Sequence, residues 1–195
     1  MSTEPFLQRA AYSLKSRSVY IGLGSNLEGK ERSRVGQIQH ALQLLIKGQT
    51  RLIQQAPLYE TRPIGVNGQN SYINTVVHIS TFLSPYGLLR KLKQLEWAEG
   101  RRGSAPRWSS RNLDMDIIDY KGLVKGWKNG VPERVSPGSL VLPHAHTHHR
   151  AFVLQPLLDI APEWKHPVFK DNVKMLLYRL RNCQFGSGGD IIKII

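Results

Sequence analysis

The pattern of apolar and polar positions predicts alternating strands and helices over most of the chain. Residues 18–23 form a short β-branched run that ends in glycine, which predicts a first strand followed by a turn at Gly24-Ser25-Asn26. Between Arg32 and Lys47, apolar residues recur at three- and four-residue spacing, as on a helix with one buried stripe. That stripe is expected to pack on a sheet.

The same reading continues through the centre of the chain. Residues 51–61 and 72–81 have the composition of strands, and the loop between them is dense in turn formers, so we expect these strands to pair. Ser84-Pro85 predicts the start of a second helix that runs toward Gly100. Residues 113–120 alternate apolar and acidic side chains and predict a further strand.

The order strand, helix, strand, strand, helix, strand indicates an α+β fold with a ferredoxin-like βαββαβ core, an antiparallel sheet with helices packed on one face. Residues 121–139 predict a long loop with room for a hairpin, and residues 152–160 and 173–180 predict a C-terminal helical segment. The expected organisation is a disordered tail (1–17), one domain (18–182) and a flexible tail (183–195).

Composition narrows the class of protein. The chain has 195 residues, 41% of them hydrophobic, and no run approaches the roughly 18 apolar residues of a membrane helix. Its single cysteine, Cys183, rules out an internal disulfide and fits a reducing compartment. We expect a cytoplasmic monomer, although the basic, serine-containing residues 1–17 also have the chemistry of an organelle transit peptide.

The charge of the chain predicts an anionic partner. Lys and Arg outnumber Asp and Glu by 27 to 14, a formal net charge of +13. Nucleic acid, anionic lipid and nucleotides would all satisfy that excess. Charge alone does not choose among them, but the basic residues are spread through the sequence without a dense basic block, which argues against nucleic acid.

A strand at residues 113–120 would place Asp114 and Asp116 on one face, about 6.6 Å apart, with a mutual repulsion of about 2.5 kcal/mol at an effective dielectric of 20. Mg²⁺ would relieve this repulsion, since proteins hold it with one or two carboxylates while phosphates and water complete its shell. Arg107 and Arg111 are suited to binding those phosphates. The alternative is a solvated charge cluster on a surface strand.

Two other motifs are candidate sites. Gly24 to Lys30 has the spacing of a phosphate-binding loop, but Glu31 stands where a Ser or Thr should follow, so we interpret this turn as structural. The run of His144, His146, His148 and His149 could form a metal cluster. It lacks a Cys partner or a His-Glu helix motif. We therefore expect one functional member, His144, which would donate a hydrogen bond to a phosphate group.

An ordered set of motifs resembles the 6-hydroxymethyl-7,8-dihydropterin pyrophosphokinase family of folate biosynthesis. The resemblance covers residues 19–167. It is carried by Gly24-Ser25-Asn26, Tyr59-Glu60-Thr61-Arg62-Pro63-Ile64-Gly65, Tyr72-Ile73-Asn74, Glu96 with Gly100-Arg101, Arg107-Trp108-x-x-Arg111-x-x-Asp114-x-Asp116, Leu142-Pro143-His144, and Arg150-Ala151-Phe152 with Pro156-Leu157.

This resemblance implies an ATP-dependent diphosphotransferase that releases AMP, with two Mg²⁺ ions brought with ATP and 6-hydroxymethyl-7,8-dihydropterin as the acceptor. The implied metal ligands are Asp114 and Asp116, and the implied catalytic set is Asp114, Asp116, Arg101 and Arg111. The implied ATP-binding set is Glu96, Arg107, Trp108, Arg111, Ile117, His144 and Arg150. The implied pterin-binding set is Thr61, Ile64, Tyr72, Asn74 and Phe152.

The strand period supports part of the pterin set independently, because Tyr72 and Asn74 share one face. One departure from the family pattern concerns phosphate binding, since Gly103 stands where a second arginine is frequent, with Arg102 adjacent. Lysines of the 121–139 loop are another candidate source of the phosphate contacts that this second arginine would make. Two rival classes stay open here, a ferredoxin-like RNA-binding module and a histidine- and aspartate-dependent metallohydrolase.

Overall fold

The computed structural model describes residues 18–27, 33–62, 70–100, 112–133, 139–182 and 191–194. Its main sheet is antiparallel and has the order β5-β1-β4-β3-β8, with β2 also paired to β4. The strands of this sheet are β1 (Val19–Ser25), β2 (Thr50–Gln55), β3 (Tyr59–Thr61), β4 (Tyr72–Thr81), β5 (Asp114–Tyr120) and β8 (Ile191–Lys193).

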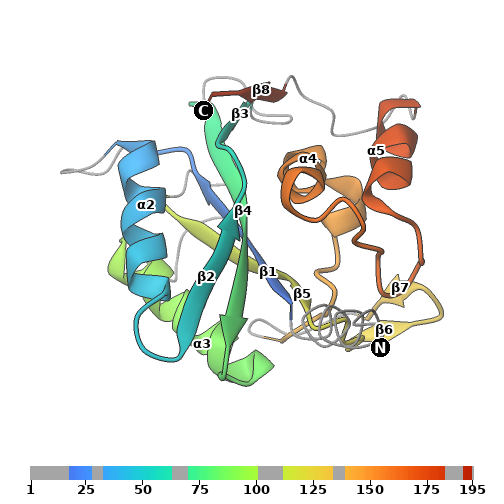
Figure 1. Ribbon diagram of the computed structural model, residues 1–195, viewed down its shortest axis with the longest axis horizontal. Coiled ribbons are helices and arrows are strands. Elements are labelled where there is room, and N and C mark those ends of the chain that lie inside the picture. Colours follow the sequence, from blue (N-terminus) through green and yellow to red (C-terminus); the bar gives the residue numbers. More distant parts are fainter. Residues whose placement is uncertain are drawn as a thin grey trace, which may run out of the picture.

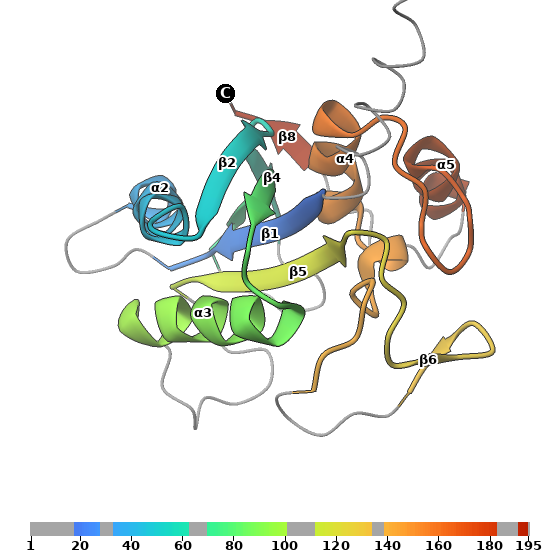
Figure 2. The same cartoon turned by 60° about the horizontal axis from the view of Figure 1, so that its bottom comes forward.

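Helices cover both faces of this sheet, as Figure 1 shows. One side holds α2 (Arg34–Leu45) and α3 (Pro85–Ala98), which are the two helices of the βαββαβ core, and Figure 2 shows α3 running beside β5. The other side holds α4 (Ala151–Ile160) and α5 (Val173–Asn182), the predicted C-terminal helical segment. The predicted ferredoxin-like core is therefore confirmed, and the C-terminal helices supply its second layer.

The alternation of side chains along β1 builds a core on each face. Ile21 and Leu23 pack in the cluster beneath α2 and α3, whereas Tyr20 belongs to the cluster with Leu154 and Leu157 of α4. In the same strand, Gly22 and Gly24 face the α4 side and are partly accessible. The α4 side is thus less densely filled at the end of β1 where Gly24 lies.

The second core helix begins where Ser84-Pro85 predicts, and α2 lies inside the range 32–47 predicted for the first. Ser33 caps α2 by accepting a hydrogen bond from the Gly36 N–H, and Ser84 caps α3 by accepting one from the Gly87 N–H. Such caps satisfy backbone donors that the first turn leaves without a partner. Pro85 follows its cap in the first turn, where a missing N–H costs no helical bond.

The structure differs from the sequence analysis at two places. The strand expected over 51–61 is interrupted at residues 56–58, because Pro57 has no N–H to donate to a ladder. Both pieces still pair with β4, so the predicted pairing is confirmed. Residues 191–193, included in the flexible tail, instead form β8 on β3 because the β-branched Ile191-Ile192 pair favours a strand.

The loop after β5 contains the expected small hairpin, formed by β6 (Trp127–Lys128) and β7 (Val131–Pro132). Asn129 and Gly130 make its turn with φ of 51° and 76°, the conformation that two-residue hairpins favour. Lys125 forms a reciprocal backbone bridge with Leu142, and Trp127 Nε1–H donates to the Pro143 carbonyl at 2.9 Å. This loop therefore supports the residues directly before His144.

Trp127 also belongs to a cluster of rings with His148, His166 and Phe169. His166 is fully buried, and its Nδ1 accepts hydrogen bonds from the N–H groups of Val168 and Phe169. Burial lowers the pKa of both His148 and His166 to about 4, because it disfavours the charged imidazolium. Both rings are therefore neutral at pH 7.

None of the helices in the described parts of the chain combines the length and the apolar character that crossing a bilayer requires.

The neutral histidines make stability depend on pH. Between pH 6.5 and about 4 the unfolded chain binds protons that folded His148 and His166 do not bind, so stability falls as pH drops through this window. In His166→Asn the side-chain oxygen can still accept the two N–H bonds. Between pH 7 and pH 5, we expect the free energy of unfolding of this variant to fall by about 1–2 kcal/mol less than that of the parent chain. Urea unfolding at both pH values measures this difference.

Equal pH dependence in His166→Asn and the parent would show that His166 is not a source of this effect.

Candidate active site

The acidic pair of β5 faces α4. Asp114 and Asp116 are partly exposed, whereas Leu113, Met115 and Ile117 between and around them are buried in the core beneath α2 and α3. This alternation is the one predicted for a strand with one solvated face. It confirms that the two carboxylates share a face.

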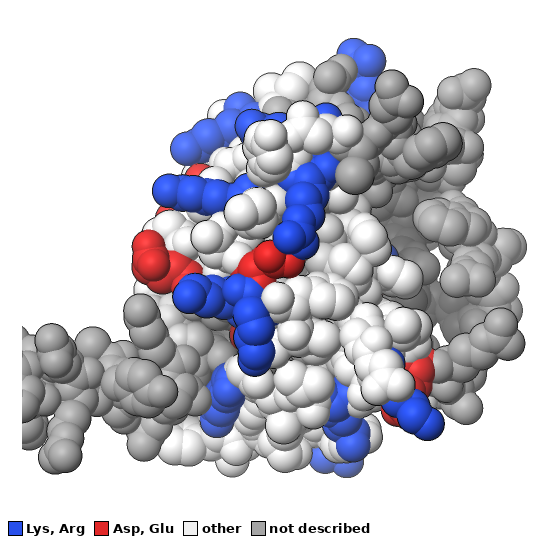
Figure 3. Space-filling model, turned by 90° about the vertical axis from the view of Figure 1, so that its right-hand side faces the viewer, with Lys and Arg blue, Asp and Glu red and all other residues white. Residues whose placement is uncertain are grey.

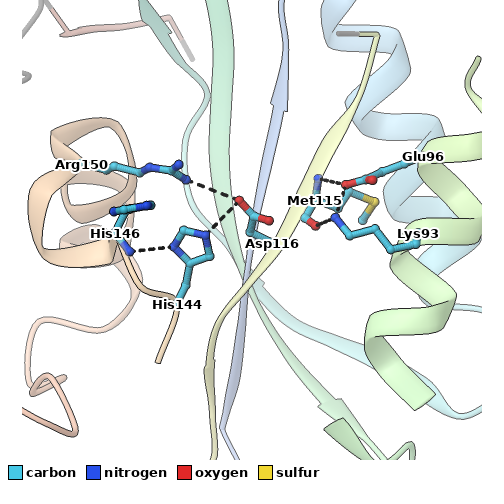
Figure 4. Close-up of polar contacts among 7 residues, drawn as sticks. All are labelled: Lys93, Glu96, Met115, Asp116, His144, His146 and Arg150. Atoms are coloured by element: carbon cyan, nitrogen blue, oxygen red, sulfur yellow. Dashed lines mark hydrogen bonds and ion pairs between the residues drawn. The ribbon is translucent and has the colours of Figure 1, made fainter. Parts of the chain in front are cut away.

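Asp116 is held in a cluster with two cationic or donor groups from the segment that leads into α4. Its Oδ2 lies 3.5 Å from His144 Nε2 and 3.4 Å from an Arg150 guanidinium nitrogen, as Figure 4 shows. All three side chains are between 20% and 30% exposed. The contacts are long for hydrogen bonds, so each partner can exchange Asp116 for another ligand at low cost.

The backbone fixes the position and tautomer of His144. Its N–H donates to the Ile118 carbonyl of β5, which brings the ring beside Asp116. Nδ1 accepts the His146 N–H at 3.2 Å, so the proton of the neutral ring is on Nε2, facing the carboxylate. Burial lowers the pKa of His144 and outweighs the opposing effect of Asp116. His144 therefore presents a neutral N–H donor.

Glu96 occupies the opposite side of β5. This α3 side chain is fully buried, and its Oε1 accepts hydrogen bonds from the Met115 N–H and from Lys93 Nζ, both at 2.8 Å. Lys93 Nζ also approaches the Met115 carbonyl at 3.3 Å (Figure 4). The peptide between the two acidic residues is thus held by both side chains. Whether Glu96 also contacts a nucleotide stays a prediction.

Ile117, another residue of the implied ATP set, has its side chain in the core beneath α2 and α3. Its neighbour Ile118 packs on the α4 side instead. The side chain of Ile117 therefore does not join Asp116, His144 and Arg150.

A second group lies on the same sheet face, across β1 from the acidic pair. Asn74 of β4 donates from Nδ2 to Thr61 Oγ1 of β3 at 2.8 Å, and both residues are buried. Tyr72 is opposite Thr61 in the β3–β4 ladder and is half-buried. The structure thus brings together Thr61, Tyr72 and Asn74.

Arg150 links Asp116 to the aromatic ring of Phe152. The Arg150 guanidinium carbon is 5.7 Å from the centre of the Phe152 ring, within the range of a cation–π contact, while its nitrogen approaches Asp116. The first turn of α4 therefore places a cation between the acidic pair and an aromatic ring.

Tyr59 holds the other end of α4 through a hydrogen bond to Asp159. Burial, together with this hydrogen bond, raises the pKa of Tyr59 to about 12.

Five predicted site residues lie outside the described residues. They are Ile64, Arg101, Arg107, Trp108 and Arg111. Their predicted roles stay predictions.

The donor set fits a magnesium ion brought with a polyphosphate. Two carboxylates on one strand face supply hard oxygen ligands, and such a pair needs phosphate oxygens and water to complete an octahedron. Among the residues that the structure describes, no group of three or more His, Cys, Asp or Glu side chains could hold a metal.

Figure 3 shows the surface on the α4 and α5 side of the molecule. Lys and Arg side chains lie at separate places on this face, several of them next to Asp or Glu, instead of forming one continuous strip. Arg179, for example, pairs with Asp171. Among the described residues on this face, the Lys and Arg side chains do not form one continuous basic strip.

Sequence reasoning missed two supporting residues. Lys93 precedes Glu96 by one helical turn, a spacing that allows an ion pair, but nothing in the sequence indicates that the pair holds Met115. Trp127 was part of an unassigned loop. An isolated tryptophan in a Gly- and Lys-rich segment was the only available signal that this loop packs against the chain before His144.

Solved structures confirm the fold. A chain of the wild-type Plasmodium falciparum HPPK-DHPS protein with STZ-DHP superposes with a TM-score of 0.63 at 18% identity, covering 83% of this chain and 43% of that one. A second chain, HPPK-DHPS A437G with SDX-DHP, gives a TM-score of 0.62 over 83% of this chain and 45% of that one. This chain therefore spans less than half the length of those proteins.

Curated relatives are closer in sequence. A 2-amino-4-hydroxy-6-hydroxymethyldihydropteridine pyrophosphokinase of Methylorubrum extorquens is 37% identical over 74% of this chain and 82% of its own length. The folic acid synthesis protein fol1 of Schizosaccharomyces pombe is 35% identical over 97% of this chain but only 25% of its own length. Residues 20–162 also match the sequence model of a protein family. The chain therefore belongs to the 7,8-dihydro-6-hydroxymethylpterin-pyrophosphokinase family.

Proposed function

We propose that this chain transfers the terminal diphosphate of ATP to the hydroxymethyl group of 6-hydroxymethyl-7,8-dihydropterin and releases AMP. The observation that carries the proposal is the placement of two groups across one strand. Asp114 and Asp116 lie on one side of β1 and Asn74 with Thr61 on the other, while Arg150 reaches both Asp116 and Phe152. Both substrate sides come from a single chain, which suits a monomer.

Asp114 and Asp116 would hold Mg²⁺ ions that arrive with ATP, two in number as the resemblance implies. Such ions neutralise phosphate charge and orient the chain of phosphates. The remaining work of the protein is to position and stabilise, since phosphoryl transfer needs little covalent help from side chains.

His144 and Arg150 are placed to bind phosphate oxygens. Arg150 offers a permanent cation and His144 a neutral Nε2–H donor, and both now face the same carboxylate oxygen. Phosphate groups beside Asp116 would take over these donors. Arg101, Arg107 and Arg111, with Trp108 against the nucleotide, complete the proposed ATP side.

Asn74 is oriented for the edge of a pterin. Its Nδ2 is used by Thr61, so its Oδ1 is the atom that can accept a hydrogen bond from an N–H edge of the heterocycle. Tyr72 and Phe152 can stack on a flat ring, with Ile64 as a further predicted contact. The hydroxymethyl oxygen would then point across β1 toward the acidic pair.

We expect Asp116→Asn to abolish AMP release, with at least a thousandfold loss of kcat, because a neutral amide neither binds the metal well nor balances its charge. The assay is AMP formation from ATP, Mg²⁺ and the dihydropterin, with circular dichroism to show that the variant folds. Asp171→Asn is the matched control, since Asp171 also pairs with an arginine but lies in the segment before α5. Release of ADP instead of AMP, or full activity of Asp116→Asn, would contradict the proposal.

The two substrate sides can be separated by mutation. We expect Phe152→Ala to raise the KM for the dihydropterin about tenfold, because it removes a stacking face worth about 1.4 kcal/mol, and to change the KM for ATP little. Arg150→Ala should mainly raise the KM for ATP, since it removes a phosphate-binding cation. Initial rates with each substrate varied in turn measure both effects. The reverse pattern would show that the two sides are assigned wrongly.

A further inference from the structure

We infer that Arg34 is a positioning residue, which acts from the face of the sheet opposite to the site. From α2 it holds the end of the β3–β4 ladder, directly beside the last residue pair, Thr61 and Tyr72. This inference rests on the proposed function and deepens it. Arg34 belongs to none of the motifs that carry the resemblance to the family.

One guanidinium nitrogen of Arg34 joins the two strands. It lies 2.6 Å from the Ser71 carbonyl oxygen, 2.7 Å from Ser71 Oγ and 3.4 Å from Glu60 Oε1. Ser71 Oγ also donates a hydrogen bond to the same Glu60 oxygen. Glu60 directly precedes Thr61, and Ser71 directly precedes Tyr72. The three polar side chains therefore tie α2 to both strands at the end of their ladder.

Arg34 and the proposed acceptor group lie on opposite faces of the sheet. Thr61 and Asn74 are hydrogen-bonded to each other on the α4 face. Ile73, which is opposite Glu60 in the ladder, is instead buried in the core beneath α2 and α3. Residues that are directly opposite in an antiparallel pair point to the same face, so Glu60 is on the α2 face. Arg34 therefore acts on the acceptor side through the backbone of β3 and β4.

The helix that carries Arg34 is a firm anchor without this contact. Ser33 caps it, and Gln37 Nε2 donates to the Leu27 carbonyl at 3.1 Å. Its buried apolar residues in the core are Ile38, Ala41, Leu42 and Leu45. Arg34 itself is unfavourable for the helix, because a cation in the first turn opposes the positive end of the helix dipole. The contacts with Glu60 and Ser71, not a requirement of α2, explain the arginine.

The end of the β3–β4 ladder needs such support. β3 has only three residues and Thr61 is its last, and the ends of short strands open more readily than their centres. Without Arg34, the Glu60 carboxylate would lose its cation and Ser71 would lose a donor to its carbonyl. The acceptor would then have to order Thr61 and Tyr72 on binding, which lowers affinity. The phosphate-binding groups on β5 and α4 would be unaffected.

The test compares Arg34→Gln with Arg179→Gln in initial rates of AMP formation, with each substrate varied in turn. We expect Arg34→Gln to raise the KM for the dihydropterin about fivefold and to leave kcat and the KM for ATP within about twofold. Arg179→Gln is the matched control, since Arg179 also pairs with a partly exposed carboxylate but lies on α5. It should change neither KM. Thermal unfolding shows whether the variants are folded.

Two further variants test the chemistry of the contact. Arg34→Lys keeps the charge but lacks the planar fork, so it should recover part of the lost affinity. Glu60→Ala should also raise the KM for the dihydropterin. The double variant Arg34→Gln with Glu60→Ala should be within about twofold of the more affected single variant, because the two residues act as one unit. Losses that multiply in the double variant would overturn the inference.

The outcomes separate this inference from the proposed function. If the parent chain releases no AMP from ATP and the dihydropterin, the proposed function itself fails. If the parent is active and Arg34→Gln keeps the parental KM for the dihydropterin, only the role of Arg34 is refuted. Equal increases of both KM values would show a general loss of structure and would also overturn the inference.

Discussion

The site depends on the hydrogen-bonding of β1 to a partner on each side. In these two ladders, Gly24 is paired with Asn74 and with Asp114, so the distance between the proposed acceptor group and the acidic pair is set by backbone spacing. A shift of either ladder by one residue would turn every side chain of the moved strand to the opposite face. Burial of Ile21 and Leu23 beneath α2 and α3 opposes such a shift, so the hydrophobic core holds the polar site in register.

The acidic pair lies on an edge strand, and this position creates a second requirement. Among the described strands, β5 is paired with β1 alone, so the outward backbone groups of Met115 need other partners. Glu96 accepts the Met115 N–H and Lys93 approaches its carbonyl, so α3 takes the place of a missing strand. A buried carboxylate is costly unless it is paired and hydrogen-bonded, and Glu96 is both. Its contacts hold the peptide from which Asp114 and Asp116 project.

Local sequence patterns were sufficient for much of this arrangement. Alternation along 113–120 predicted that Asp114 and Asp116 share a face, and Ser33 and Ser84 mark helix starts through bonds made within one turn. Contacts between distant segments were not predictable in this way. The role of Glu96 depends on where α3 meets β5, and the role of Trp127 depends on a loop folding back onto Pro143. Neither placement is encoded in a local spacing.

The charges around Asp116 show how such a site can exist before its substrates bind. Two aspartates on one strand face repel each other by about 2.5 kcal/mol, and Arg150 offsets part of that repulsion from 3.4 Å away. The contact is partly exposed and long for a hydrogen bond, so little free energy is lost when it breaks. An incoming magnesium polyphosphate supplies cations to the aspartate and anions to the arginine together. The same groups that stabilise one another in the folded chain are therefore the ones that the proposed substrate separates and pairs again.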